Sequence, residues 1–129
     1  MSIRSNHPFP PRGRGVHYFE VEILPTENPP TLETWVGIGL CGEFVDMSYG
    51  FPGSYAYNPS AGYHGDDGNM YESFLLNGLG RSTGKTYGEG DTVGCGINWS
   101  KNSVYYTLNG KLVGAYYEPV DPSSSKRQY

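Results

Sequence analysis

Residues 103–113, which read SVYYTLNGKLV, decide the fold class of this protein. A run rich in valine and tyrosine comes first, then Asn109 and Gly110, then a second short run that ends at Val113. Asn-Gly is the pair most favoured in a two-residue type I′ turn, because both central residues of that turn need a positive φ. The stretch therefore predicts a β-hairpin with strands at 103–108 and 111–113.

Further strand patterns lie on the N-terminal side of this hairpin. In residues 16–24, apolar side chains at 19, 21 and 23 alternate with Glu20 and Glu22, which is typical of a half-buried strand. Residues 35–41 and 92–98 alternate in the same way, and residues 62–64 and 69–71 flank a GDDG turn. Residues 77–90 are expected to form a polar loop. No window has the pattern of a capped helix, so we expect an all-β sandwich or barrel.

Composition and charge exclude several classes of protein. A length of 129 residues suits one domain, and 19 glycines with 10 prolines disfavour helices. The net charge is −4 and no basic cluster is present, which excludes nucleic acid and anionic membrane surfaces as expected partners. The sequence has no apolar run of membrane-spanning length and no apolar signal segment at its start. We therefore expect a cytoplasmic or nuclear protein.

Short enzyme motifs occur in residues 78–86 (GLGRSTGKT), but without the context that they need. A phosphate-binding loop requires glycine where this chain has Leu79, and a helix directly after the Lys-Thr pair. A nucleophile elbow on Ser82 also requires a helix after the turn. The residues that follow include Gly88 and Gly90, and do not begin a helix. A glycine-rich surface loop is the favoured interpretation.

His64, Asp66 and Asp67 are the candidate metal ligands or acid–base residues. Neighbouring residues of an extended strand point to opposite faces, so these carboxylates converge only within the turn itself. No calcium-loop spacing and no second His/Cys cluster accompanies them. A capping or Asx-turn role is favoured for the aspartates. We expect no catalytic activity, no metal and no cofactor.

Aromatic residues gather in the long connection between residues 42 and 62. The set within nine positions is Tyr49, Phe51, Pro52, Tyr55 and Tyr57. Tyrosine is favoured at binding surfaces because it has a rigid apolar body and a polar tip. Two interpretations stay open for these rings: some form a lid on the end of the sandwich, and some form a contact surface.

The chain resembles the SPRY domain family in blocks that follow the order of that family. These blocks are RSNHP at 4–8, GVHYFEVEI at 15–23, VGIGL at 36–40, GYHGDDG at 62–68, GDTVGCG at 90–96 and YTLNG at 106–110. The YHGDDG and RSNHP blocks resemble more narrowly the Ran-binding-protein-M branch, especially its fungal members. The resemblance covers the chain from about Arg4 to Ala115.

This resemblance implies a bent sandwich of two antiparallel sheets that binds proteins without catalysis. Relatives in the branch serve as scaffolds or substrate receptors of the ubiquitin ligase built on LisH and CTLH domains. Peptides dock on loops at one end of SPRY sandwiches, and the matching residues here are Arg4, Pro10, Pro11, Tyr49, Phe51, Pro52 and Tyr55, with Tyr57 beside them. The alternative function is a carbohydrate-binding, lectin-like sandwich, because lectin folds resemble this one and tyrosines stack on sugars.

The end of the chain departs from the family pattern. SPRY domains normally continue beyond the position of Pro119 with further strands, whereas residues 121–129 are polar. We expect residues 1–120 to form a partial SPRY domain, truncated before its last strands, and residues 121–129 to be a tail or the point of truncation. Unpaired sheet edges invite pairing with another chain, so we expect self-association.

Overall fold

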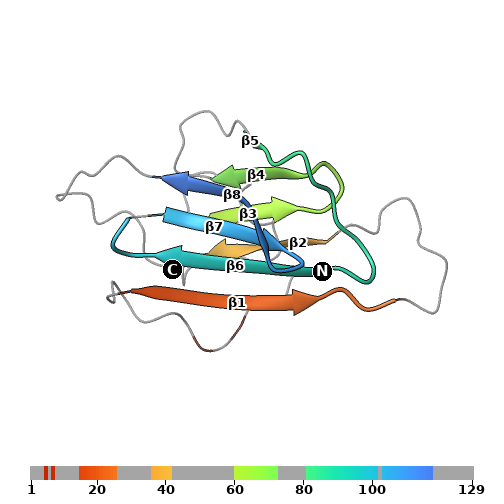
Figure 1. Cartoon of the computed structure of the whole chain (residues 1–129), viewed down its shortest axis with the longest axis horizontal. Coiled ribbons are helices and arrows are strands. Elements are labelled where there is room, and N and C mark those ends of the chain that lie inside the picture. Colours follow the sequence, from red (N-terminus) through yellow and green to blue (C-terminus); the bar gives the residue numbers. More distant parts are fainter. Residues whose placement is uncertain are drawn as a thin grey trace.

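The computed structural model describes residues 5, 7, 15–25, 36–41, 60–72, 81–101 and 103–117. They contain two antiparallel sheets, and Figure 1 shows one sheet lying in front of the other. The first has the order β1-β6-β7-β8, from β1 (Val16–Glu22), β6 (Thr92–Asn98), β7 (Ser103–Leu108) and β8 (Lys111–Tyr117). The second has the order β2-β3-β4-β5, from β2 (Gly37–Cys41), β3 (Ser60–His64), β4 (Asn69–Glu72) and β5 (Arg81–Ser82). The expected all-β sandwich is confirmed.

The predicted strands agree with the observed ones except at some boundaries. The strands predicted at 92–98 and 103–108 are observed with those bounds, whereas β1 ends two residues before the predicted end at residue 24. Strand β8 extends beyond the predicted 113 to Tyr117. The polar loop predicted at 77–90 contains strand β5, where Ser82 pairs with Asn69 and Arg81 with Met70. Two residues are too few to show an alternating pattern, so strand β5 is recognised only from its pairing with β4.

The β7–β8 hairpin has the predicted turn. Asn109 has φ of 51° and Gly110 has φ of 81°, so both central residues are in the left-handed region that a type I′ turn requires. The side chain of Asn109 also reaches back to β6, where its Oδ1 atom accepts a hydrogen bond of 2.9 Å from the Thr92 amide. The turn is therefore stabilised by both its backbone and its side chain.

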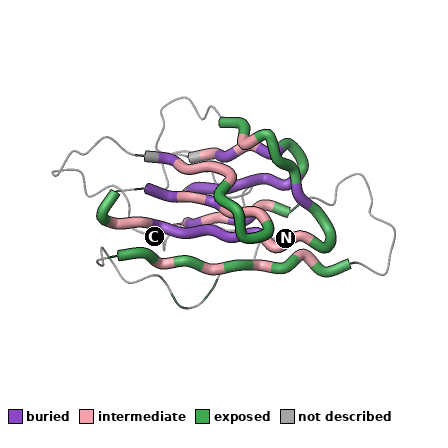
Figure 2. Tube along the Cα trace, viewed as in Figure 1, coloured by how far each residue is buried: buried purple, intermediate pink, exposed green. Residues whose placement is uncertain are grey.

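The hydrophobic core fills the space between the two sheets. Figure 2 shows buried residues along β6 and β7, while β1 alternates between exposed and half-buried positions. The buried apolar side chains are Ile38, Leu40, Ala61, Tyr63, Met70, Tyr87, Val93, Cys95, Ile97, Val104, Tyr106 and Tyr116. Tyrosine is frequent among them because its ring fills the core while its hydroxyl can reach a backbone carbonyl. The described residues include no helix that is long and apolar enough to cross a membrane.

Buried tyrosines also hold the segment after β5 against the second sheet. The Tyr87 hydroxyl lies 2.6 Å from the carbonyl oxygen of Tyr63 and 2.8 Å from that of Val36. The Tyr63 hydroxyl donates to the carbonyl oxygen of Lys85. Burial raises the pKa of Tyr87 far above its ordinary range, so this phenol stays protonated and available as a donor.

Candidate functional site

The residues predicted to bind a peptide lie outside the described part of the chain. They are Arg4, Pro10, Pro11, Tyr49, Phe51, Pro52, Tyr55 and Tyr57. Their grouping into one surface therefore stays a prediction.

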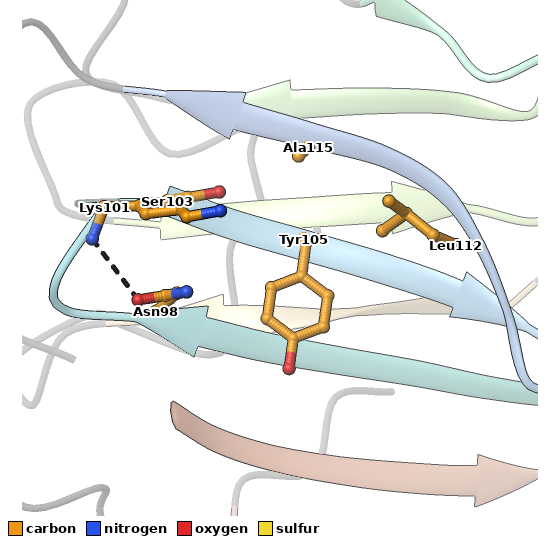
Figure 3. A pocket seen from close by; sticks show the side chains of 6 residues that line it. All are labelled: Asn98, Lys101, Ser103, Tyr105, Leu112 and Ala115. Atoms are coloured by element: carbon orange, nitrogen blue, oxygen red, sulfur yellow. Dashed lines mark hydrogen bonds between the residues drawn. The ribbon is translucent and has the colours of Figure 1, made fainter. Parts of the chain in front are cut away.

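The outward face of the β1-β6-β7-β8 sheet carries a pair of tyrosines, the exposed Tyr18 on β1 and the half-buried Tyr105 on β7. Both are paired in register with Gly96 of the intervening strand β6. The ring of Tyr105 lies flat across β6 (Figure 3), where a Cβ atom on Gly96 would lie 2.8 Å from its Cε1 atom. Tyr18 leans towards Gly94 instead, and a Cβ atom there would contact its hydroxyl. The two rings, parallel within 6° and 6.0 Å apart between centroids, are called the tyrosine platform below.

Hydrogen bonds hold Tyr18 in this orientation. Its hydroxyl lies 2.5 Å from the Oγ1 atom of Thr107 on β7 and donates to the Oε1 atom of Glu20 at 2.9 Å. Burial is the largest cause that raises the pKa of Tyr18, and the hydrogen bond to Glu20 raises it further. Burial also raises the pKa of Tyr105. Both phenols are therefore neutral at physiological pH, and the platform presents two uncharged rings.

A shallow cavity of about 220 Å³ adjoins the platform (Figure 3). It is lined by Asn98, Lys101, Ser103, Tyr105, Leu112 and Ala115. The polar residues gather at one end, where Asn98 Oδ1 accepts hydrogen bonds from the amides of Ser100 and Lys101. At the other side Leu112 is 66% exposed. The cavity therefore places a few polar side chains beside the Tyr105 ring, although its volume is below the roughly 300–1,000 Å³ of usual small-molecule sites.

The platform was not found by sequence reasoning, although a weak signal for it exists. Residues 18 and 105 fall on the polar face of their alternating strands, and glycines occupy the outward positions 94 and 96 of β6. Glycine inside a strand often marks the close approach of another group. Only the register of β1, β6 and β7 shows that the two rings lie over these glycines, and the sequence alone does not give that register.

In the GDDG turn, the ligand-type atoms of His64, Asp66 and Asp67 lie within 4.8 Å of one another. Both oxygens of Asp67 already accept hydrogen bonds inside the hairpin, Oδ1 from the Asn69 amide at 2.8 Å and Oδ2 from the Tyr71 hydroxyl at 2.6 Å. The hydrogen bond to Asp67 is the main cause that raises the pKa of Tyr71. The predicted Asx-turn role is therefore confirmed for Asp67, whose carboxylate closes the turn.

The glycine-rich loop lacks the geometry of a phosphate site in its described part, residues 81–90. No helix follows Lys85 there; the chain continues through a turn in which Thr83 Oγ1 donates to the carbonyl oxygen of Gly68 at 2.7 Å. The backbone of Lys85 is instead the acceptor for Tyr63. This segment packs against the β3–β4 hairpin and has a structural role.

The two antiparallel sheets define a β-sandwich domain. The chain belongs to the SPRY domain family, whose model matches residues 16–124. A crystal structure of a human SPRY domain superposes with a TM-score of 0.62 at 29% identity, covering 84% of this chain and 68% of that one. SPRY domains mediate protein interactions, and this chain is consistent with such a module.

Curated relatives agree with this assignment. Ran-binding protein 9 of Danio rerio is 38% identical over 122 residues, which cover 95% of this chain and 19% of that protein. The human Ran-binding protein 9 is 37% identical over the same share of this chain and is covered over 15% of its length. The chain therefore spans less than a fifth of the length of these two relatives.

Proposed function

We propose that this chain is a protein-interaction module that recognises a short peptide or a partner's loop, as a substrate receptor or scaffold of a ubiquitin ligase complex. The observation that carries this proposal is the 37–38% identity to Ran-binding proteins 9 over 95% of the chain. The ligase role rests on the resemblance to the fungal Ran-binding-protein-M branch and its LisH and CTLH scaffolds. Residues 1–120 are the binding unit of this proposal and residues 121–129 its polar tail.

The proposed peptide site consists of the segment before β1 and the tyrosine-rich loop after β2. Arg4, Pro10 and Pro11 belong to the first, and Tyr49, Phe51, Pro52, Tyr55 and Tyr57 to the second. Exposed tyrosines give large contact areas at a low cost in conformational entropy, which supports recognition by aromatic burial. In this proposal the module is non-catalytic, needs no cofactor or metal, and binds neither nucleic acid nor membranes.

The compartment and the assembly state belong to the same proposal. We place the protein in the cytoplasm or the nucleus. Self-association occurs through sheet edges: β8 is the outer strand of its sheet among the described residues, and an open edge can pair with another chain. Light scattering tests this part, and a monodisperse monomer at high protein concentration contradicts it.

The decisive experiment is affinity capture from cytosol with the full chain as bait and mass spectrometry as readout. The test variant is Tyr49→Ala/Tyr55→Ala, and the control is Leu24→Ala, which removes a 66% exposed apolar side chain that lies outside both the tyrosine-rich loop and the tyrosine platform. We expect ligase subunits, or proteins that share a peptide motif, to be captured by the parent chain and by the control but lost with the loop variant. Both baits must keep the melting temperature of the parent chain.

Two outcomes contradict the proposal. If the loop variant captures the same proteins as the parent, the tyrosine-rich loop is not the peptide site. If the chain instead binds to a glycan array with no protein partner, the lectin-like alternative replaces the protein-binding function.

A further inference from the structure

The tyrosine platform is an aromatic surface on the strands of a sheet rather than on a loop. Tyr18 is 39% exposed, and the apolar side chains of Val16 and Leu112, 52% and 66% exposed, lie on the same outward face. Tyrosine rings on an outward face are favoured at binding surfaces, because tyrosine combines a rigid apolar body with a polar tip. We therefore ask which ligand has a shape and charge that match the platform.

The shape of the platform favours a planar group. The two rings lie against glycines of β6 with their planes within 6° of each other, and Thr107 fixes the Tyr18 hydroxyl. Proline-rich peptides dock in grooves between aromatic rings, whereas flat rings offer a face for stacking. A guanidinium group is planar, weakly hydrated and stacks on tyrosine faces, whereas an ammonium group is a compact point charge.

The charges around the platform favour a cation. Glu20 and Glu22 are exposed on β1 beside it, and Glu20 pairs in register with Gly94, which underlies Tyr18. Among the described residues only the Tyr18 hydroxyl donates to the Glu20 carboxylate, through Oε1, and a carboxylate has the capacity to accept further hydrogen bonds. Lys101 follows the opposite end of β6, and the net charge of the chain is −4. A polyanion such as single-stranded nucleic acid is therefore disfavoured.

From this combination we infer that the platform binds an arginine of a partner peptide, with the guanidinium stacked on the rings of Tyr18 and Tyr105 and hydrogen-bonded to Glu20. The adjoining cavity holds the neighbouring peptide residue. Its polar end contains Asn98 and Lys101, whose side-chain nitrogens can donate to the peptide backbone. The proposed loop site is not used in this inference, so an experiment that contradicts one proposal does not contradict the other.

The test is a titration of the ¹⁵N-labelled full chain with a nine-residue glycine-serine peptide that carries one central arginine, followed by NMR. Matched peptides carry lysine or citrulline at the same place. We expect amide shifts centred on Gly94, Gly96 and Tyr105. The lysine peptide should bind about tenfold more weakly, as the loss of a stacked cation–π contact predicts. Citrulline, which keeps the planar shape but has no charge, should not bind measurably.

Variants test the contributions of the Tyr105 ring, the Tyr105 hydroxyl and the Glu20 carboxylate to binding separately. Tyr105→Phe keeps the ring and should bind like the parent chain. Tyr105→Leu and Glu20→Gln should each weaken binding about tenfold. Gly96→Ala provides a second test, because its Cβ atom displaces the Tyr105 ring from the sheet while the ring itself is retained. It should also weaken binding.

The inference is overturned if the lysine and arginine peptides bind equally, if the shifts map to other residues, or if Tyr105→Leu binds like the parent chain. It is also overturned if the arginine peptide fails to bind while glucose or maltose produces shifts at the platform. In that case the flat rings would serve a neutral sugar. Circular dichroism of each variant verifies that its fold is retained.

Discussion

The Tyr116 hydroxyl donates a hydrogen bond of 2.5 Å to the carbonyl oxygen of Met70 and so connects β8 in one sheet to β4 in the other. Tyr116 is 2% exposed, and the guanidinium of Arg81 lies 5.3 Å from the centre of its ring. Burying a carbonyl oxygen that has a hydrogen-bond partner costs far less free energy than burying one that has none. This hydrogen bond therefore links the two sheets across the core.

Removing this hydroxyl should destabilise the fold. We expect Tyr116→Phe to lower the free energy of unfolding by about 1–2 kcal/mol, because the Met70 carbonyl loses its side-chain donor in a buried place. Urea unfolding measures the change. Tyr105→Phe removes the same atom from a half-buried ring on the outward face and should stay within about 0.5 kcal/mol of the parent chain. Equal losses in both variants would contradict the role of the inter-sheet bond.

Gly39 should tolerate no side chain. A Cβ atom at this position would collide with the carbonyl oxygen of Ala61 on the neighbouring strand β3, which is backbone and cannot move aside. We expect Gly39→Ala to cost about 3 kcal/mol or more, or to prevent folding. Gly88→Ala is the matched control, since its Cβ atom would have nothing within 4 Å. It should leave the melting temperature nearly unchanged.

Asn109 should contribute to stability through both its backbone and its side chain. Asn109→Ala loses the hydrogen bond to the Thr92 amide and places alanine at a positive φ, so we expect a loss of about 1–2 kcal/mol. Asn109→Gly keeps the backbone conformation at no steric cost and should recover part of this loss. If glycine gives no recovery in urea unfolding, the side-chain contacts account for the whole effect.

Asp91 should make stability depend on pH in the acid range. Hydrogen bonds from Asn109 Nδ2, at 3.0 Å, and from the Gly88 amide lower the pKa of Asp91 below its ordinary value of 3.8. Because the folded-state pKa is depressed, this contribution is present above the unfolded-state pKa and is lost as the pH falls through the folded-state pKa. Between pH 6 and about pH 2, we expect the free energy of unfolding to fall less in Asn109→Ala than in the parent chain.

An NMR titration of the Asp91 carboxyl carbon provides the direct measurement. The midpoint should lie below the ordinary aspartate value in the parent chain and move up towards it in Asn109→Ala. An unchanged midpoint in the variant would show that the Asn109 amide does not stabilise the carboxylate.

The sequence predicted the central elements well because their signals are local. The alternation from Phe19 to Ile23 and the Asn109–Gly110 pair each depend on neighbouring residues, and the structure has the strands and the turn that they predict. Strand β5 was missed because two residues carry no period, and only pairing with β4 defines it. The loop residues from Tyr49 to Tyr57 lie outside the described residues, and their role remains a prediction.

The sequence by itself determined the all-β class, the central hairpin and the resemblance to SPRY domains, since turn chemistry and a period of two are properties of consecutive residues. Only the tertiary structure decided which tyrosines are buried. Tyr105 and Tyr106 are neighbours, yet one ring lies on the outer platform and the other in the core. Tyrosine has an apolar body and a polar tip and suits either side of a sheet. The alternation along β7 groups Tyr105 with Ser103 and Thr107, but only the position of the second sheet decides that the side of Val104 and Tyr106 is the buried one.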